Sequence, residues 1–184
     1  MRRLCALLVP LLSVSYTLSA TVILPAEFRE IVSGSQIIVH GRVTDVRAEW
    51  VEGRSRIESF VTIEPAIWFK GSPLPAITFR TPGGQVGRYK SITVGAPEFR
   101  PGEEAVLFLK TQGRAVPQVF GLNQGVFRVR VDSRTGRRLV IRHALIAQGP
   151  AADRVIRGDR NRRPLTLDAF AAQVRAAVQQ GGAQ

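Results

Sequence analysis

Two histidines are the first residues to test for metal or acid–base chemistry, because imidazole is the commonest metal ligand in proteins. His40 and His143 lie far apart in the sequence, and neither belongs to an H-E-x-x-H motif or has a second histidine at helical spacing. His40 falls on the polar side of a predicted strand, which indicates a surface residue, and His143 ends a strand, which indicates packing. We therefore predict no metal and no cofactor, although a mixed histidine and carboxylate site stays open.

Serine and carboxylate arrangements for catalysis are also missing from the sequence. No serine lies in a G-x-S-x-G elbow, and Ser33-Gly34-Ser35 is better explained as the end of a helix. Glu58 and Glu64 share one face of a predicted strand, but their separation of about 20 Å is too large for a glycosidase pair. We predict that the protein is not an enzyme, although folding could still bring another carboxylate pair together.

A glycine-rich segment lies between two predicted strands. It lacks the Gly-Lys-Ser/Thr of a Walker motif and the strand-to-helix setting of a dinucleotide site. We interpret it as a loop, and loops on a rigid β scaffold often bind ligands. The candidate binding-loop residues are Gly83, Gly84, Gln85 and Gly87.

Arginines recur in a predicted hairpin whose strands, 126–131 and 138–142, flank a turn at 132–136. This turn would place Arg130 directly opposite Arg138, and like charges in that position repel. An anionic partner would relieve the repulsion, whereas the alternative is a solvated face screened by salt. The only aromatic residue of the hairpin is expected to point inward, so nucleic acid, which needs stacking rings, is not an expected partner. The candidate anion-binding residues are Arg128, Arg130, Arg138 and Arg142.

The chain begins with the pattern of a secretory signal peptide. Two arginines precede an apolar stretch of about a dozen residues, shorter than the roughly 20 that span a bilayer, and small polar residues follow. We predict a signal peptide over residues 1–20, a secreted or periplasmic protein, and no transmembrane anchor after cleavage; a buried N-terminal helix is the alternative. Cleavage would remove Cys5, the single cysteine, and with it any disulfide.

Length and charge limit the remaining possibilities. The chain has 184 residues, which suggests one domain, and 26 Lys+Arg against 14 Asp+Glu give a net charge of +12. A basic balance favours acidic partners, but it also aids solubility and can reflect codon bias. We expect a monomer.

Hydrophobic periodicity predicts a mainly β domain over residues 21–147. A short helix at 25–32 precedes a long strand whose alternation changes phase near Thr44-Asp45, which indicates a β-bulge. The apolar run at 105–109 suits a central strand buried on both faces.

A basic linker at 148–164 and a C-terminal helix at 165–184 follow the β domain. The helix shows apolar residues at the spacing of one helical face. The predicted fold is a closed or half-closed antiparallel β-barrel of the oligonucleotide/oligosaccharide-binding (OB) type with a short N-terminal helix and a C-terminal helix, and a β-sandwich is the alternative.

The segments IIVHGRVTDVRAEW, FRTPGGQVG and FRPGEEAVLFL make the chain similar to a family of uncharacterised secreted bacterial proteins over residues 24–143. The order HGRV, WFKGSP, FRPGEEAVLFL also resembles the OB-barrel of netrin and tissue-inhibitor-of-metalloproteinase modules. Those modules use an N-terminal cysteine and disulfides, which the chain lacks after cleavage.

The expected function is that of a secreted, non-enzymatic β-barrel module that binds a protein or an envelope polymer. One alternative is binding of a polyanion, either envelope polysaccharide or lipid headgroups, through the arginine-rich hairpin. Another alternative is an inhibitor or accessory of a secreted protease.

Overall fold

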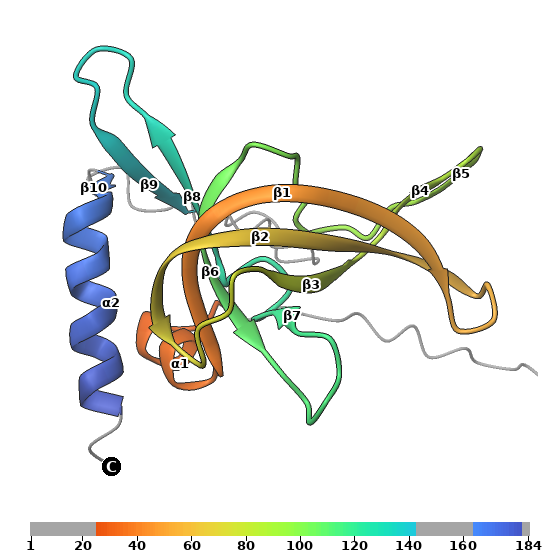
Figure 1. Cartoon of the computed structure of the whole chain (residues 1–184), viewed down its shortest axis with the longest axis horizontal. Helices are drawn as coiled ribbons and strands as arrows, with labels where there is room; N and C mark the ends of the chain where they lie inside the picture. Colours follow the sequence, from red (N-terminus) through yellow and green to blue (C-terminus); the bar gives the residue numbers. More distant parts are fainter. Residues whose placement is uncertain (1–24, 143–163, 182–184) are drawn as a thin grey trace, which may run out of the picture.

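A computed structural model describes residues 25–142 and 164–181 (Figure 1). The predicted signal peptide, nearly all of the predicted linker, and His143 lie outside the described residues. The described elements are, in chain order, α1 (Phe28–Ser33), β1 (Ile37–Val51), β2 (Arg56–Lys70), β3 (Ile77–Pro82), β4 (Gly84–Val86), β5 (Tyr89–Ser91), β6 (Glu104–Lys110), β7 (Gln118–Val119), β8 (Val126–Val131), β9 (Arg138–Arg142), β10 (Leu165–Thr166) and α2 (Leu167–Gly181).

β1 and β2 form a long, curved antiparallel ribbon that dominates the view in Figure 1. The pairing register shifts between Val43 and Asp45, so the predicted bulge is confirmed. Because a bulge inserts one extra residue, Val43 and Val46 on its two sides both pack against the same core. The strands also approach closely at Gly41, where a Cβ atom would lie 2.2 Å from the carbonyl oxygen of Glu64.

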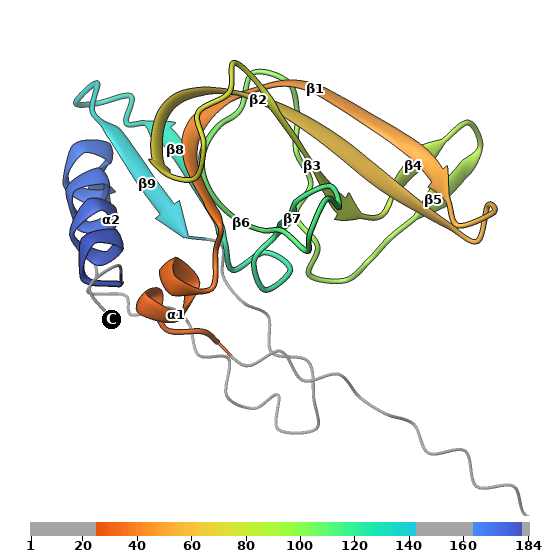
Figure 2. The same ribbon diagram turned by 60° about the horizontal axis from the view of Figure 1, so that its bottom comes forward.

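Eight strands form one large sheet in the order β1-β2-β3-β7-β6-β8-β9-β10, and β1 also pairs with β6. Figure 2 shows the strands curving around a common centre. The mainly β prediction is confirmed, but the expectation of a purely antiparallel sheet is wrong, because β7 runs parallel to β3 through the pair Arg80 and Gln118. β7 is antiparallel to β6 and lies between β6 and β3 in the sheet. This two-residue strand therefore links β3 and β6, which run in opposite directions.

β6 separates two hydrophobic clusters, as predicted for a strand buried on both faces. Ala105, Leu107 and Leu109 belong to a cluster enclosed by the curved strands. Val106 and Phe108 point the other way, into a cluster that includes residues of both helices. All five side chains have no exposed surface.

The two helices cover the second cluster. α1 is closed at its start by a capping box between Glu27 and Glu30, and the ammonium group of Lys70 donates to the carbonyl of Val32 at its end. α2 buries Phe170 among its inward-facing residues, as its spacing predicts, and the rings of Phe28 and Phe170 meet at 5.8 Å. The N-terminal helix is shorter than predicted and begins at Phe28.

Candidate functional site

The sheet divides into two ribbons at the first residue of β6. Glu104 is paired with Arg42 of β1 on one side and with Val129 of β8 on the other. Beyond this row β1 continues with β2, whereas β8 continues with β9 into a hairpin that projects away from the ribbon (Figure 1). We call this division the fork.

The turn before β6 is held on the β1 side of the fork. The N–H of Val43 donates to the carbonyl of Glu103 at 2.8 Å, and the N–H of Gly102 donates to the carbonyl of Val43 at 2.7 Å. Gly102 has a φ of 88°, a conformation that glycine adopts at little cost. The turn therefore fills the backbone positions beside β1 and leaves the β8 side open.

A depression of about 450 Å³ lies in the fork, and we call it the fork groove. Four arginines from three parts of the chain contribute to its wall, together with two glutamates and small or apolar residues. Its lining consists of Arg42, Arg100, Gly102, Glu103, Glu104, Arg128, Val129, Arg130 and Val131.

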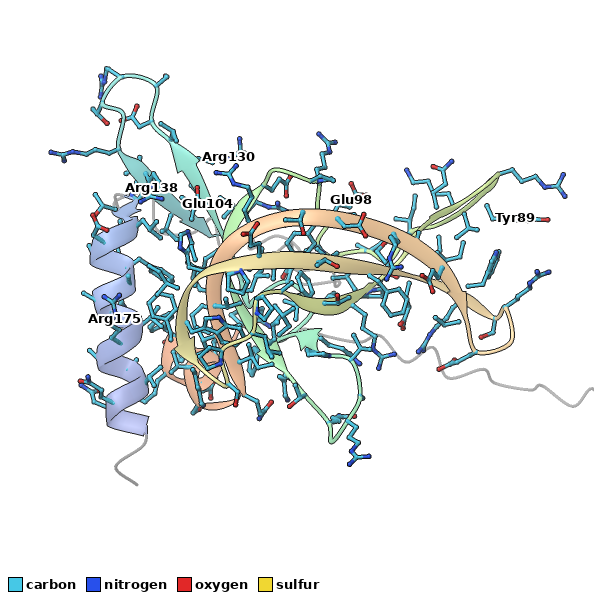
Figure 3. All side chains as sticks on the ribbon, in the orientation of Figure 1. Tyr89, Glu98, Glu104, Arg130, Arg138 and Arg175 are labelled. Atoms are coloured by element: carbon cyan, nitrogen blue, oxygen red, sulfur yellow. The ribbon has the colours of Figure 1, made fainter. Side chains whose placement is uncertain are left out.

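Two arginines near the groove are neutralised by carboxylates and have a structural role. Arg128 forms an ion pair with Glu103, donates to the carbonyl of Glu98, and places its guanidinium 5.2 Å from the centre of the Phe99 ring. Arg138 reaches Oε1 of Glu104 at 3.2 Å. These contacts fix the turn and the base of the hairpin, where Figure 3 shows Glu104 and Arg138 side by side.

The other arginines of the groove keep their charge available. Arg42, Arg100 and Arg130 are exposed, and within residues 25–142 and 164–181 none of them forms an ion pair. Arg42 also donates to the carbonyl of Gly102 at 3.1 Å, which holds its side chain over the turn. Three uncompensated guanidinium groups around one concavity create a positive potential there.

His40 supports the groove from the protein interior. Its Nε2 atom lies 2.7 Å from Oε1 of Glu104, and its Nδ1 atom is buried with no hydrogen-bond partner in the described part of the chain. Only 3% of His40 is exposed, so the prediction of a surface residue is wrong. Its face of β1 also carries Ile38, which belongs to the cluster beneath the helices, and therefore does not face solvent.

The hairpin register differs by one residue from the prediction. Arg130 lies opposite Leu139, and Arg138 lies opposite Val131, so the predicted repulsion between Arg130 and Arg138 is absent. The turn is one residue tighter because the N–H of Asp132 donates to the carbonyl of Arg137.

The new register divides the predicted anion-binding residues between two faces. Arg128 and Arg130 lie on one face of the hairpin, whereas Arg138 and the backbone position of Arg142 lie on the other. The structure thus brings Arg130 together with Arg42 and Arg100, which the sequence did not single out.

The hairpin turn contains a carboxylate with a shifted pKa. The hydroxyl of Thr135 donates to Asp132 at 2.7 Å, and the N–H of Arg134 donates at 3.0 Å. Both bonds favour the charged form, so they lower the pKa of Asp132, with Thr135 the main cause.

The glycine-rich segment lies away from the β8–β9 hairpin, near the far end of the β1–β2 ribbon (Figure 1). Part of it, Gly84–Val86, forms β4 and pairs with β5, so the interpretation as a loop is wrong for these residues. Gly83, Gly84 and Gln85 line a pocket of about 250 Å³, whereas Gly87 lies in the turn after β4. Tyr89 of β5 lies at the right of Figure 3, and its ring packs edge to face against Trp50 at 5.6 Å.

Other site types find no support among the described residues. No group of three or more histidine, cysteine or carboxylate side chains is arranged to hold a metal within them. In the same part of the chain, no helix has the length and apolar character needed to cross a membrane.

No family model, curated protein or solved structure matches the chain. The resemblances drawn from the sequence motifs therefore stay predictions, and the geometry of the fork groove is the main evidence on function.

Proposed function

We propose that the protein is an exported, non-enzymatic β-barrel module that binds an acidic ligand in the fork groove. The observation that carries the proposal is the convergence of Arg42, Arg100 and Arg130 on one depression without a carboxylate partner in the described chain. Guanidinium groups bind carboxylates and phosphates through paired, charge-assisted hydrogen bonds. The ligand that we propose therefore carries several carboxylate, sulfate or phosphate groups.

The rigid surroundings of the three arginines support this proposal. Arg128 ties the turn to β8, and the contact of His40 with Glu104 ties β1 to β6. A site whose frame is ordered before binding loses less conformational entropy when the ligand arrives. The neutralised residues thus hold the wall of the groove while the open arginines meet the ligand.

The strand pairings and the N-terminal pattern support the other parts of the proposal. β1 pairs with both β2 and β6, and β7 lies between β3 and β6, which is consistent with a barrel of OB type. The signal pattern at residues 1–20 supports export, where envelope or extracellular anions are available. The net charge, +12 for the full chain and 12 − 2 = +10 without Arg2 and Arg3, would favour encounter with such anions.

Binding of two defined polyanions tests the proposal. The purified protein is titrated calorimetrically with poly-glutamate and with a heparin oligosaccharide, at low salt and at about 0.5 M salt, where exposed charges are screened. We expect binding of at least one probe at low salt. The combined variant Arg42→Gln, Arg100→Gln, Arg130→Gln should weaken it by at least about tenfold, because it removes several charge-assisted bonds.

A variant with the same loss of charge elsewhere provides the control. Arg29, Arg47 and Arg114 are also exposed, and none of them lines the fork groove. Replacing these three by glutamine should change the affinity far less than the groove variant does. Equal losses in the two variants would show that only net charge matters, and the proposed site would be wrong.

A further inference from the structure

The backbone of Val131 faces the fork groove. The N–H of Phe108 in β6 donates to the carbonyl of Gly125, so Gly125 faces β6. The N–H of Asp132 donates to the carbonyl of Arg137, so Asp132 faces the β9 side. Because successive residues of an antiparallel strand direct their polar groups to opposite sides, both bonds place the N–H and carbonyl of Val131 on the β6 side.

No strand occupies that position beside Val131. β6 begins at Glu104, which pairs with Val129, so its register would bring Gly102 opposite Val131. Gly102 instead donates its N–H to Val43 on the far side of the fork. Within the described chain the N–H and carbonyl of Val131 have no backbone partner, and its side chain is 64% exposed.

We infer that the fork groove binds an extended acidic peptide segment, which adds to the edge of β8 along the line that β6 leaves at Glu104. This inference rests on the proposed function and names its ligand. The peptide would exchange two backbone hydrogen bonds with Val131, in the manner of β-strand addition, and would cover the exposed valine side chain. Its acidic side chains would meet Arg42, Arg100 and Arg130 around the same groove.

The charge of the site selects between possible occupants. A second copy of the chain is itself strongly basic, with or without residues 1–20, and would be repelled by the arginines. A sulfated or phosphorylated polymer satisfies the arginines, but it does not offer the alternating N–H and carbonyl groups that match the open edge at Val131. An acidic peptide satisfies both features.

Backbone methylation of a synthetic peptide separates strand addition from charge attraction. The probe is a short, end-blocked peptide of alternating glutamate and threonine, and its partner has the same sequence with alternate amides N-methylated. Both carry equal charge, but methylation removes the N–H groups on one edge. We expect the unmodified peptide to bind at least about tenfold more tightly at low salt, the equivalent of one or two hydrogen bonds.

A pair of variants at Val131 tests the same edge from the side of the protein. Val131→Pro removes the N–H that faces the groove, whereas Val131→Ala shortens the side chain and keeps the N–H. The bonds to β9 should survive in both variants, because Arg130 and Asp132 direct their polar groups to that side. We expect the proline variant to bind the unmodified peptide about tenfold more weakly than the alanine variant does, with heparin binding equal in the two.

Each outcome decides between the inference and the proposed function. Equal affinity for the two peptides would overturn strand addition even where the arginine variant still abolishes binding. Binding of heparin but not of peptide would overturn it in favour of a polysaccharide. Equal peptide affinity in the unaltered protein and in the variant that lacks the three groove arginines would overturn the proposed site, and with it the inference. The peptide comparison uses the unaltered protein, so it holds even where the proline variant fails to fold.

Discussion

Nε2 of His40 lies 2.7 Å from Oε1 of Glu104, the same oxygen that Nη1 of Arg138 reaches at 3.2 Å. One carboxylate oxygen therefore accepts from strands β1 and β9 while its own residue begins β6. Since a carboxylate only accepts hydrogen bonds, the hydrogen in the contact with His40 lies on Nε2. The three side chains join the base of the hairpin to the ribbon.

Replacing Glu104 by alanine should destabilise the protein by about 2–3 kcal/mol, because the buried imidazole N–H would lose its acceptor. The measurement is the free energy of unfolding from urea titration followed by circular dichroism. Glu49→Ala is the matched control: the Glu49 side chain is 52% exposed, and its Oε1 lies 3.9 Å from Nη1 of Arg47. An exposed pair of this kind contributes about 0–1 kcal/mol. Similar losses in the two variants would contradict a structural role for Glu104.

Gly41→Ala should cost about 3 kcal/mol or prevent folding, because the added Cβ would lie 2.2 Å from the backbone oxygen of Glu64. Gly53→Ala is a useful comparison, since a Cβ there meets no atom within 4 Å although φ is 63°. That variant should lose only about 1–2 kcal/mol, the cost of the left-handed backbone conformation. Thermal unfolding of both proteins measures the difference, and an equally mild effect at Gly41 would contradict the close approach of β1 and β2.

Arg128→Ala should loosen the turn at 100–103 without exposing either core cluster. The substitution removes the contacts with Glu103, Glu98 and Phe99 that bind the turn to β8. We expect faster amide hydrogen exchange at Gly102 and Glu103 with little change in α2. Anion affinity should also fall, although Arg128 itself is paired, because the wall of the groove is no longer fixed. Unchanged exchange at the turn would contradict this role.

Asp132 should titrate below the ordinary range of an aspartate, because Thr135 and Arg134 donate to its charged form and lower its pKa. A lowered pKa means that the carboxylate stabilises the turn above the unfolded pKa of Asp132 and loses this effect as pH falls through the folded pKa. Thr135→Val should raise the pKa towards its ordinary value, because it removes the main donor. The carboxyl carbon chemical shift of Asp132 measures both titrations, and identical curves would contradict the role of Thr135.

The sequence predicted the parts of the fold in which the spacing of apolar residues along one element shows which of its side chains are buried. The bulge between Val43 and Asp45 appeared as a change of phase, and the strand at 105–109 appeared as an uninterrupted apolar run. The inward face of α2, with Phe170 at its centre, followed from helical spacing. In each case one segment contained the whole signal.

The hairpin register could not be obtained in this way. Val129 can pack beside either Leu139 or Val140, because both are apolar, and alternation alone does not choose between them. The choice is made by the turn, where Asp132 bonds to Arg137 and Thr135 bonds back to Asp132. A shift of one residue moves every side chain of one strand to the other face, which is why the predicted arginine face was wrong.

Two of the three open groove arginines were missed for a different reason. Arg42 and Arg100 are separated along the chain from Arg130. All three line one groove because β6 begins only at Glu104, whereas its neighbours β1 and β8 continue beyond that row and leave a gap between them. The available signal was a turn, Arg100-Pro101-Gly102, directly before an apolar strand, but it does not reveal what lies beside that turn. His40 was misplaced similarly, since the partner that buries it comes from a distant strand.

The alternation of β6 between two clusters has a consequence for how the molecule melts. Leu107 packs on one side of the strand and Phe108 on the other, so the two hydrophobic clusters share β6 as a common boundary. Loss of the helices would expose one face of β6 to solvent while its other face still lines the cluster enclosed by the curved strands. Loss of those strands would likewise expose the opposite face. The described domain should therefore unfold in one cooperative transition, in which a defect introduced on either side lowers the same global midpoint.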